Sequence, residues 1–117
     1  MRKFISYVIF AILFIMLWRE YCEWAKDLYI DTFDSYRDGP TILMVGGTHG
    51  NEPAGKLALQ KYIQNIKNGH ITLKRGKLIV IAETNKSGGM FHFRFMLHNW
   101  LHPDLNRNYS DVGKEPI

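Results

Sequence analysis

An apolar run near the start of the chain limits what the chain can fold into. Arg2 and Lys3 precede fifteen residues, Phe4 to Trp18, of which only Ser6 is neither apolar nor aromatic. As a helix that rises 1.5 Å per residue, this run is about 22 Å long. A bilayer has a hydrocarbon core of about 30 Å, so spanning it would need local thinning and snorkelling of the two basic side chains.

Three interpretations of this run are open: an uncleaved signal anchor, a cleaved leader, and a buried helix of a soluble fold. We favour the anchor because the residues after Trp18 contain no small-x-small cleavage site, and Cys22 lacks the small residues that precede a lipoprotein site. Basic residues before the run place the domain outside the cytoplasm, although Arg19 on the other flank weakens that orientation. We therefore expect a single-pass membrane protein with an extracytoplasmic domain.

The chain has 117 residues, which leaves room for one small domain after the anchor of residues 1–18. Ordinary numbers of Gly (10) and Pro (4) and a single Cys exclude collagen-like, low-complexity and disulfide-rich scaffolds. Residues 19–38 carry 3 basic and 6 acidic side chains interspersed with aromatics, and we expect a stalk or a short amphipathic helix there. The domain itself is then expected over residues 39–117.

The apolar pattern after residue 40 predicts an α/β fold. Thr41 to Val45 is short and almost wholly apolar, which is typical of a strand covered on both faces. Lys77 to Ala82 has the same character, and helical spacing of apolar residues lies between the two strands. This order predicts a mixed or parallel sheet with flanking helices. Residues 84–109 are expected to form a long loop, which in a compact domain is either functional or wrongly assigned.

His49-Gly50-Asn51-Glu52 lies where the first predicted strand gives way to the helix. Asn51 can cap that helix, with Glu52 and Pro53 in its first turn. At this edge of an α/β sheet, His49 and Glu52 can converge on one pocket and offer an imidazole nitrogen and a carboxylate oxygen to Zn²⁺. The competing interpretation is that His49 only packs and Glu52 complements the positive start of the helix.

A second motif, Asp104-Leu105-Asn106-Arg107, follows Pro103. Alone it is compatible with an Asx turn that carries a solvated arginine. Together with Gly47-Thr48-His49-Gly50-Asn51-Glu52, it resembles the zinc carboxypeptidase superfamily, in particular the succinylglutamate desuccinylase and aspartoacylase branch. The resemblance covers about residues 41–110, with both motifs in the expected order and at roughly the expected separation.

The resemblance implies a role for each matching residue. His49 and Glu52 would be two of three zinc ligands, and Asp104 would accept a hydrogen bond from the other ring nitrogen of His49. Asn106 and Arg107 would hold a substrate carboxylate, for which the planar guanidinium offers a bidentate match.

The resemblance also implies metal-assisted hydrolysis of an amide, in which zinc polarises the carbonyl and acidifies a water molecule. A carboxylate takes the proton and returns it to the leaving amine. Glu52 is needed as a ligand and cannot be that base. The family has a further arginine that steadies the oxyanion, and Arg94 is the only arginine in the loop before Asp104.

In the family, the third ligand, a His, and the catalytic Glu come from segments well downstream of the second motif, and this sequence ends ten residues after Arg107. His92, His98 and His102 precede Asp104 and are interpreted as loop or surface residues. Glu83 is interpreted as the solvated end of a strand. We therefore expect the N-terminal part of a zinc hydrolase domain, with little or no activity from these 117 residues alone.

Two functions compete at this point. The first is a membrane-anchored zinc hydrolase that acts on an amide next to a free carboxylate, in an acylated amino acid or in a peptide. The second is a membrane-tethered α/β domain that binds no metal. A nucleic-acid binder is disfavoured, because Lys74, Arg75 and Lys77 form only a small basic cluster. Substrate identity and oligomeric state do not follow from the sequence.

Overall fold

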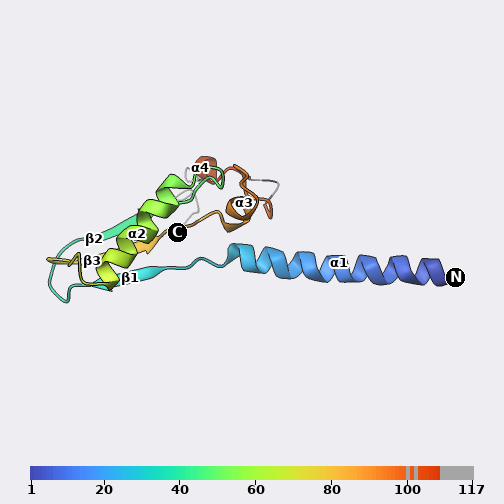
Figure 1. The fold of residues 1–117 in the computed structure, drawn as a ribbon, viewed down its shortest axis with the longest axis horizontal. Coiled ribbons are helices and arrows are strands. Elements are labelled where there is room, and N and C mark those ends of the chain that lie inside the picture. Colours follow the sequence, from blue (N-terminus) through green and yellow to red (C-terminus); the bar gives the residue numbers. More distant parts are fainter. Residues whose placement is uncertain (100, 102, 109–117) are drawn as a thin grey trace, which may run out of the picture.

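The fold is a small three-stranded sheet with helices around it, preceded by one long helix (Figure 1). The computed structural model describes residues 1–99, 101 and 103–108. Along the chain, the described elements are α1 (Arg2–Lys26), β1 (Asp31–Asp34), β2 (Thr41–Val45), α2 (Ala54–Lys67), β3 (Lys77–Ile81), α3 (Lys86–Met90) and α4 (Leu105–Asn108).

The sheet has the order β1-β3-β2. β2 and β3 run parallel, with Thr41 opposite Lys77 and Val45 opposite Ile81, whereas β1 is antiparallel to β3. Parallel neighbours need a crossover connection, and α2 supplies it. The predicted α/β class with a mixed sheet is therefore confirmed. The long loop predicted over residues 84–109 contains two short helices, α3 and α4.

The core lies between β3 and α2. Leu78 and Val80 of β3 and Ile63 of α2 are buried and pack as one cluster. Val80 has no exposed surface, as expected for the central strand of the sheet. Partly buried side chains complete the cluster: Phe33, Met44, Leu59, Tyr62, Ile66, Leu73 and Ala82.

β2 differs from the prediction in its burial. We expected a strand covered on both faces, but Ile42, Leu43 and Val45 are 49%, 59% and 40% exposed. β2 is an edge strand, so it lacks a neighbour on one side within the described residues. The apolar run was correctly predicted as a strand, but an apolar pattern alone does not show which elements cover it.

Residues 19–38, expected as a stalk or a short amphipathic helix, divide between a helix and a strand. The first part continues α1 as far as Lys26, and the second part contains β1, which belongs to the sheet. The acidic side chains of β1 are paired: Asp31 lies 2.6 Å from Lys67 of α2, and Asp34 lies 3.0 Å from Lys77 of β3. Because the lysine partners come from distant parts of the chain, the acidic pattern looked like a solvated segment in the sequence.

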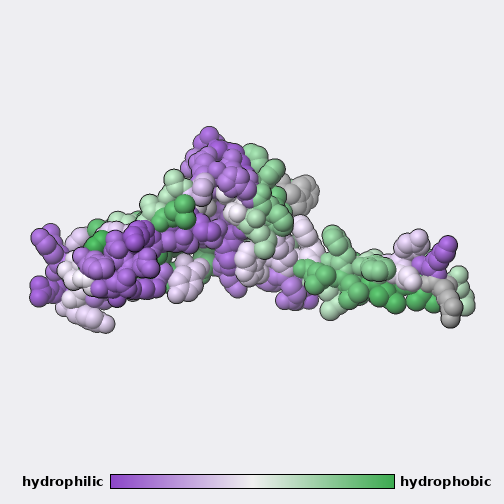
Figure 2. Space-filling view, viewed as in Figure 1, coloured by the Kyte–Doolittle hydropathy of each residue, from purple (hydrophilic) through white to green (hydrophobic). Residues whose placement is uncertain are grey.

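α1 is longer than the apolar run that predicted it. Its 25 residues make a helix of about 37 Å. By length and composition, residues 3–26 could cross a membrane as an anchor or belong to a signal sequence. None of the residues in the most apolar window of this helix is buried, and Figure 2 shows it as a green rod extending from the rest of the molecule.

Leu78→Ala should lower the free energy of unfolding by about 2–4 kcal/mol, because it leaves a cavity in the cluster between β3 and α2. The matched control is Leu57→Ala, since Leu57 of α2 is 58% exposed. That change should stay within about 0.5 kcal/mol. Equilibrium urea unfolding in detergent micelles measures both, and equal losses would contradict this placement of the core.

Candidate metal centre

The turn after β2 brings an imidazole and a carboxylate together. The backbone N–H of Glu52 donates to the carbonyl of His49 over 3.2 Å, which closes the turn. His49 Nδ1 then lies 3.3 Å from Glu52 Oε2. The predicted helix start needs correction, because α2 begins at Ala54 with Pro53 as its N-cap residue. Asn51 and Glu52 belong to the preceding turn, which His49 and Glu52 hold closed.

His49 lies between two carboxylates. Its ring is 9% exposed, and Nε2 lies 3.0 Å from Asp104 Oδ1 on the side opposite Glu52. A neutral imidazole carries one N–H and can donate to only one carboxylate. The second contact therefore calls for a proton or a cation. This is the arrangement expected of a metal-binding histidine whose other nitrogen is held by a carboxylate.

The donor pair of His49 and Glu52 fits zinc. Two ligands at about 2.0–2.1 Å from a tetrahedral ion are about 3.3–3.4 Å apart. The distance between His49 Nδ1 and Glu52 Oε2 is 3.3 Å. Within the part of the chain that the structure describes, no three His, Cys, Asp or Glu side chains form a group that could hold a metal ion. The described residues thus offer two donors and the carboxylate that orients one of them.

Asp104 reaches His49 from the residue just before α4. Its Oδ1 also accepts the backbone N–H of Asn106 over 3.0 Å, so the Asx turn considered from the sequence is present. The hydrogen bond with His49 is the main cause that holds the pKa of Asp104 below its usual value, and the Asn106 N–H adds to it. Asp104 is therefore a carboxylate at neutral pH, as an orienting acceptor must be.

Arg94 joins the same group of side chains. Its Nη1 donates to Glu52 Oε1 over 2.8 Å, so each carboxylate oxygen of Glu52 has its own partner. The backbone next to it is held as well, because the Arg94 carbonyl accepts the Gly50 N–H over 3.4 Å. The structure thus places Arg94 beside the donor pair, where the sequence suggested it only because no other arginine precedes Asp104 in that loop.

Asn85 is a site residue that sequence analysis missed. It follows β3 and is 1% exposed. Its Nδ2 donates to the carbonyls of Arg94 (3.1 Å) and Thr48 (3.4 Å), and its Oδ1 accepts the Gly88 N–H over 2.8 Å. It therefore ties the turn after β2 to the loop that carries Arg94. A polar residue at the carboxyl end of a strand next to the first motif was the available signal.

A cavity of about 70 Å³ adjoins the donor pair. Lys56 and Glu83 form an ion pair of 2.7 Å in its wall. Glu83, expected as a solvated strand end, is only 24% exposed, because Lys56 of α2 covers it. The residues that line the cavity are Gly47, His49, Gly50, Glu52, Pro53, Lys56, Glu83, Gly89 and His92.

The remaining candidates lie in different surroundings. Asn106 and Arg107 are exposed and are not among the residues lining the cavity. Their binding of a substrate carboxylate therefore stays a prediction. His92 lines the cavity, whereas His98 Nδ1 lies 3.0 Å from Ser87 Oγ. Burial is the main cause that lowers the pKa of His98. His102 lies outside the described residues.

Comparison with known proteins agrees with the two motifs. Residues 38–115 match the family model described as the succinylglutamate desuccinylase/aspartoacylase catalytic domain. A crystal structure of an aspartoacylase family protein from Mesorhizobium loti matches with a TM-score of 0.59 and 24% identity, over 71% of this chain and 24% of that chain. That likeness supports the fold. Among curated proteins, none matches the chain.

Gly50→Ala should disrupt the centre, because a Cβ there would overlap the carbonyl carbon of Gly88 and two backbone segments would have to separate. We expect a loss of about 1–3 kcal/mol of unfolding free energy, as for other overpacked sites. Gly55→Ala is the matched control, since its Cβ would meet nothing closer than 3.9 Å. Within α2 it should be neutral or stabilising by about 0.5–1 kcal/mol. Urea unfolding of both variants tests this.

The contact between Asp104 and His49 should depend on acidity in the metal-free chain. Because the folded pKa of Asp104 is below 3.8, the contact contributes fully above pH 3.8 and is lost as pH falls through the lowered value. NMR titration of the Asp104 carboxyl measures this directly. In His49→Ala, its pKa should rise toward 3.8, and an unchanged pKa would show that His49 is not the main cause.

Proposed function

Because the chain belongs to the succinylglutamate desuccinylase/aspartoacylase family, whose members are amide hydrolases, we propose that its site binds zinc and serves hydrolysis of an amide next to a free carboxylate. The observation that carries this proposal is the position of His49. Its buried ring lies between the carboxylates of Glu52 and Asp104, at 3.3 Å and 3.0 Å. A cation on the Glu52 side would satisfy both nitrogens at once.

In this proposal, His49 Nδ1 and Glu52 Oε2 hold the metal. When bound, zinc supplies Lewis acidity that polarises a carbonyl and makes a water molecule more acidic. Asp104 would accept a hydrogen bond from the N–H of His49 Nε2, which fixes the ring orientation and leaves the lone pair of Nδ1 free for the metal. Glu52 has both oxygens engaged, one toward His49 and one toward Arg94, and is therefore unsuited to carry a proton.

Arg94 has the charge and position to act on the substrate carbonyl. A guanidinium beside the donor pair can donate to the oxygen on which negative charge develops. At 39% exposure it is accessible from solvent, and its ion pair with Glu52 keeps it at the site before substrate binds. Asn106 and Arg107, which are exposed after Asp104, would hold the substrate carboxylate through amide and bidentate guanidinium contacts.

The family acts on acylated amino acids, and this substrate class is the one we propose. Such a substrate has both groups that the candidate residues would recognise, an amide carbonyl and a carboxylate. A peptide with a free carboxylate shares this chemistry and is the alternative if α1 places the domain outside the cell. We also propose that α1 acts as a membrane anchor, since it is apolar and exposed.

Zinc titration of purified chain separates the proposed roles. His49→Ala should abolish binding because it removes a donor, and Asp104→Asn should weaken it about 10–100-fold by releasing the ring. Arg107→Ala is the control. It should leave the affinity for zinc unchanged and lower the affinity for an acylamino acid. Isothermal titration calorimetry with zinc, and then with ligand, measures both.

A wild-type chain that shows no zinc binding dependent on His49 would favour the second candidate, a membrane-tethered domain without metal. The observation behind that candidate is that the described residues provide two donors instead of three. Loss of zinc from Arg107→Ala would contradict the assigned roles.

A further inference from the structure

We propose that residues 90–97 form a second membrane contact, which lies in the interfacial region of the bilayer beside α1. The inference rests on the proposed insertion of α1 and goes beyond it, because it places the catalytic domain at a defined depth. The partner is the lipid bilayer itself, whose acyl chains enter the groove between this segment and α1.

The segment exposes apolar side chains to an unusual degree. Met90, Phe91, Phe93 and Phe95 are 62%, 61%, 51% and 37% exposed. A contiguous exposed apolar patch marks an interaction surface in a soluble domain. Figure 2 shows pale green, apolar surface on the part of the domain nearest to α1. Phe is among the side chains that membrane-surface segments bury at the boundary between headgroups and acyl chains.

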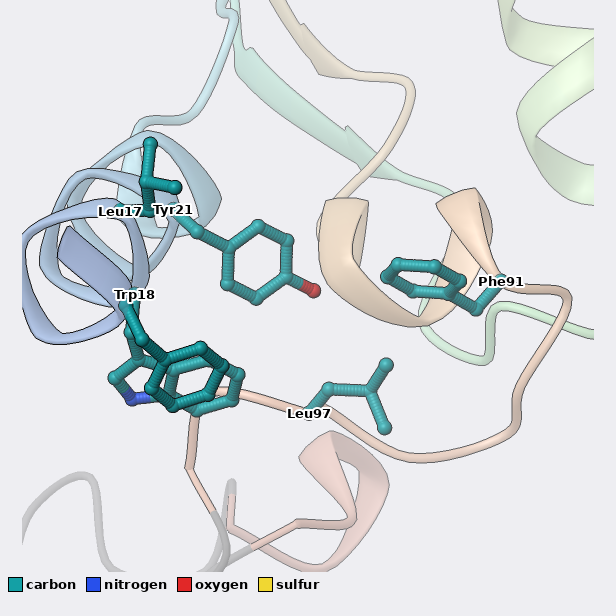
Figure 3. A pocket seen from close by; sticks show the side chains of 6 residues that line it. Leu17, Trp18, Tyr21, Phe91 and Leu97 are labelled. Atoms are coloured by element: carbon teal, nitrogen blue, oxygen red, sulfur yellow. The ribbon is translucent and has the colours of Figure 1, made fainter. Parts of the chain in front are cut away.

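The groove fixes the depth of this segment relative to α1. It measures about 560 Å³, and all six residues lining it are apolar or aromatic. Figure 3 shows Leu17, Trp18 and Tyr21 of α1 on one side and Phe91 and Leu97 on the other. The α1 wall runs from Phe14 to Tyr21, which is about 10 Å along a helix. Phe91 and Leu97 therefore lie at the level of the last apolar turns of α1.

Hydrogen bonds and ring contacts hold α1 and the segment of residues 90–97 side by side. Lys86 Nζ donates to the carbonyls of Trp24 (2.8 Å) and Asp27 (2.7 Å) at the C-terminal end of α1. The same ammonium lies 4.6 Å from the ring centroid of Trp24. The rings of Tyr21 and Phe91 lie 6.4 Å apart across the groove. If α1 enters a bilayer, the segment must therefore follow it to the interface.

The groove is continuous with the exposed apolar surface of α1, and this argues that lipid fills it. The α1 wall of the groove belongs to the same exposed helix, and none of the residues in its most apolar window is buried. Phe14, Trp18, Tyr21 and Trp24 form a chain of neighbouring rings along this end of α1, with centroids 5.5–6.4 Å apart. Such a belt is typical of the level where a membrane helix leaves the hydrocarbon. An acyl chain alongside α1 would meet the groove without leaving the bilayer.

Depth-dependent fluorescence quenching tests the proposal on the full chain. In a Cys22→Ser background, an environment-sensitive fluorophore is attached at Phe91→Cys, and the protein is reconstituted into phosphatidylcholine and phosphatidylglycerol vesicles. Nitroxide lipids labelled near the headgroup should remove most of the Phe91 emission, and lipids labelled near the acyl-chain end should remove less. The same probe at Leu13→Cys should show the reverse order, as a residue within the bilayer.

Leu57→Cys is the matched control, because Leu57 has a similar exposure of 58% but lies on α2. It should stay unquenched by both lipids. Quenching at Leu13 without quenching at Phe91 would overturn the second contact and leave the anchor intact. No quenching at either position would overturn both. If the emission of the probe at position 91 changes with the protein-to-lipid ratio and not with the nitroxide lipids, the segment contacts a second copy of the chain. This outcome also overturns the proposal. Zinc titration of the same samples reports on the proposed function independently.

Discussion

The parallel pairing of β2 with β3 is the constraint on which the site depends. In this register Val45 lies opposite Ile81, so the chain leaves both strands at the same edge of the sheet. The segments that follow are held together by the Thr84 and Asn85 N–H groups, which donate to the carbonyls of Gly46 and Gly47. Without this pairing, His49 and Arg94 would belong to unrelated loops.

The elements that depend on local sequence were predicted well. The apolar runs indicated the positions of β2 and β3, and helical spacing indicated α2 with a start two residues too early. β1 was missed because its four residues include two aspartates, and their lysine partners lie on α2 and β3. The two motifs led us to expect that His49, Glu52 and Asp104 meet, as they do in the structure. Asn85 escaped notice because its importance lies in backbone contacts made across the fold.

The electrostatics of the site follow from putting one imidazole between two carboxylates. Two negative groups next to His49 favour a positive charge there, and Arg94 neutralises the Glu52 oxygen that faces away from the ring. With Glu52, Asp104 and Arg94 all charged, the group has a net negative charge, which favours a metal cation on the Nδ1 side. In the proposal above, this cation is zinc, and the 3.3 Å between His49 Nδ1 and Glu52 Oε2 is compatible with two ligands of a tetrahedral ion.

One short helix, α3, connects the site to α1. On one side Gly88 donates to Asn85 and lies against Gly50, so α3 supports the turn that carries His49. On the other side Lys86 donates to the carbonyl of Trp24, near the end of α1, and to that of Asp27, just after it. A displacement of α3 would therefore move both contacts together. If α1 is anchored in a bilayer, the position of α3 at the membrane also sets how the proposed centre is presented to a substrate that arrives along the surface.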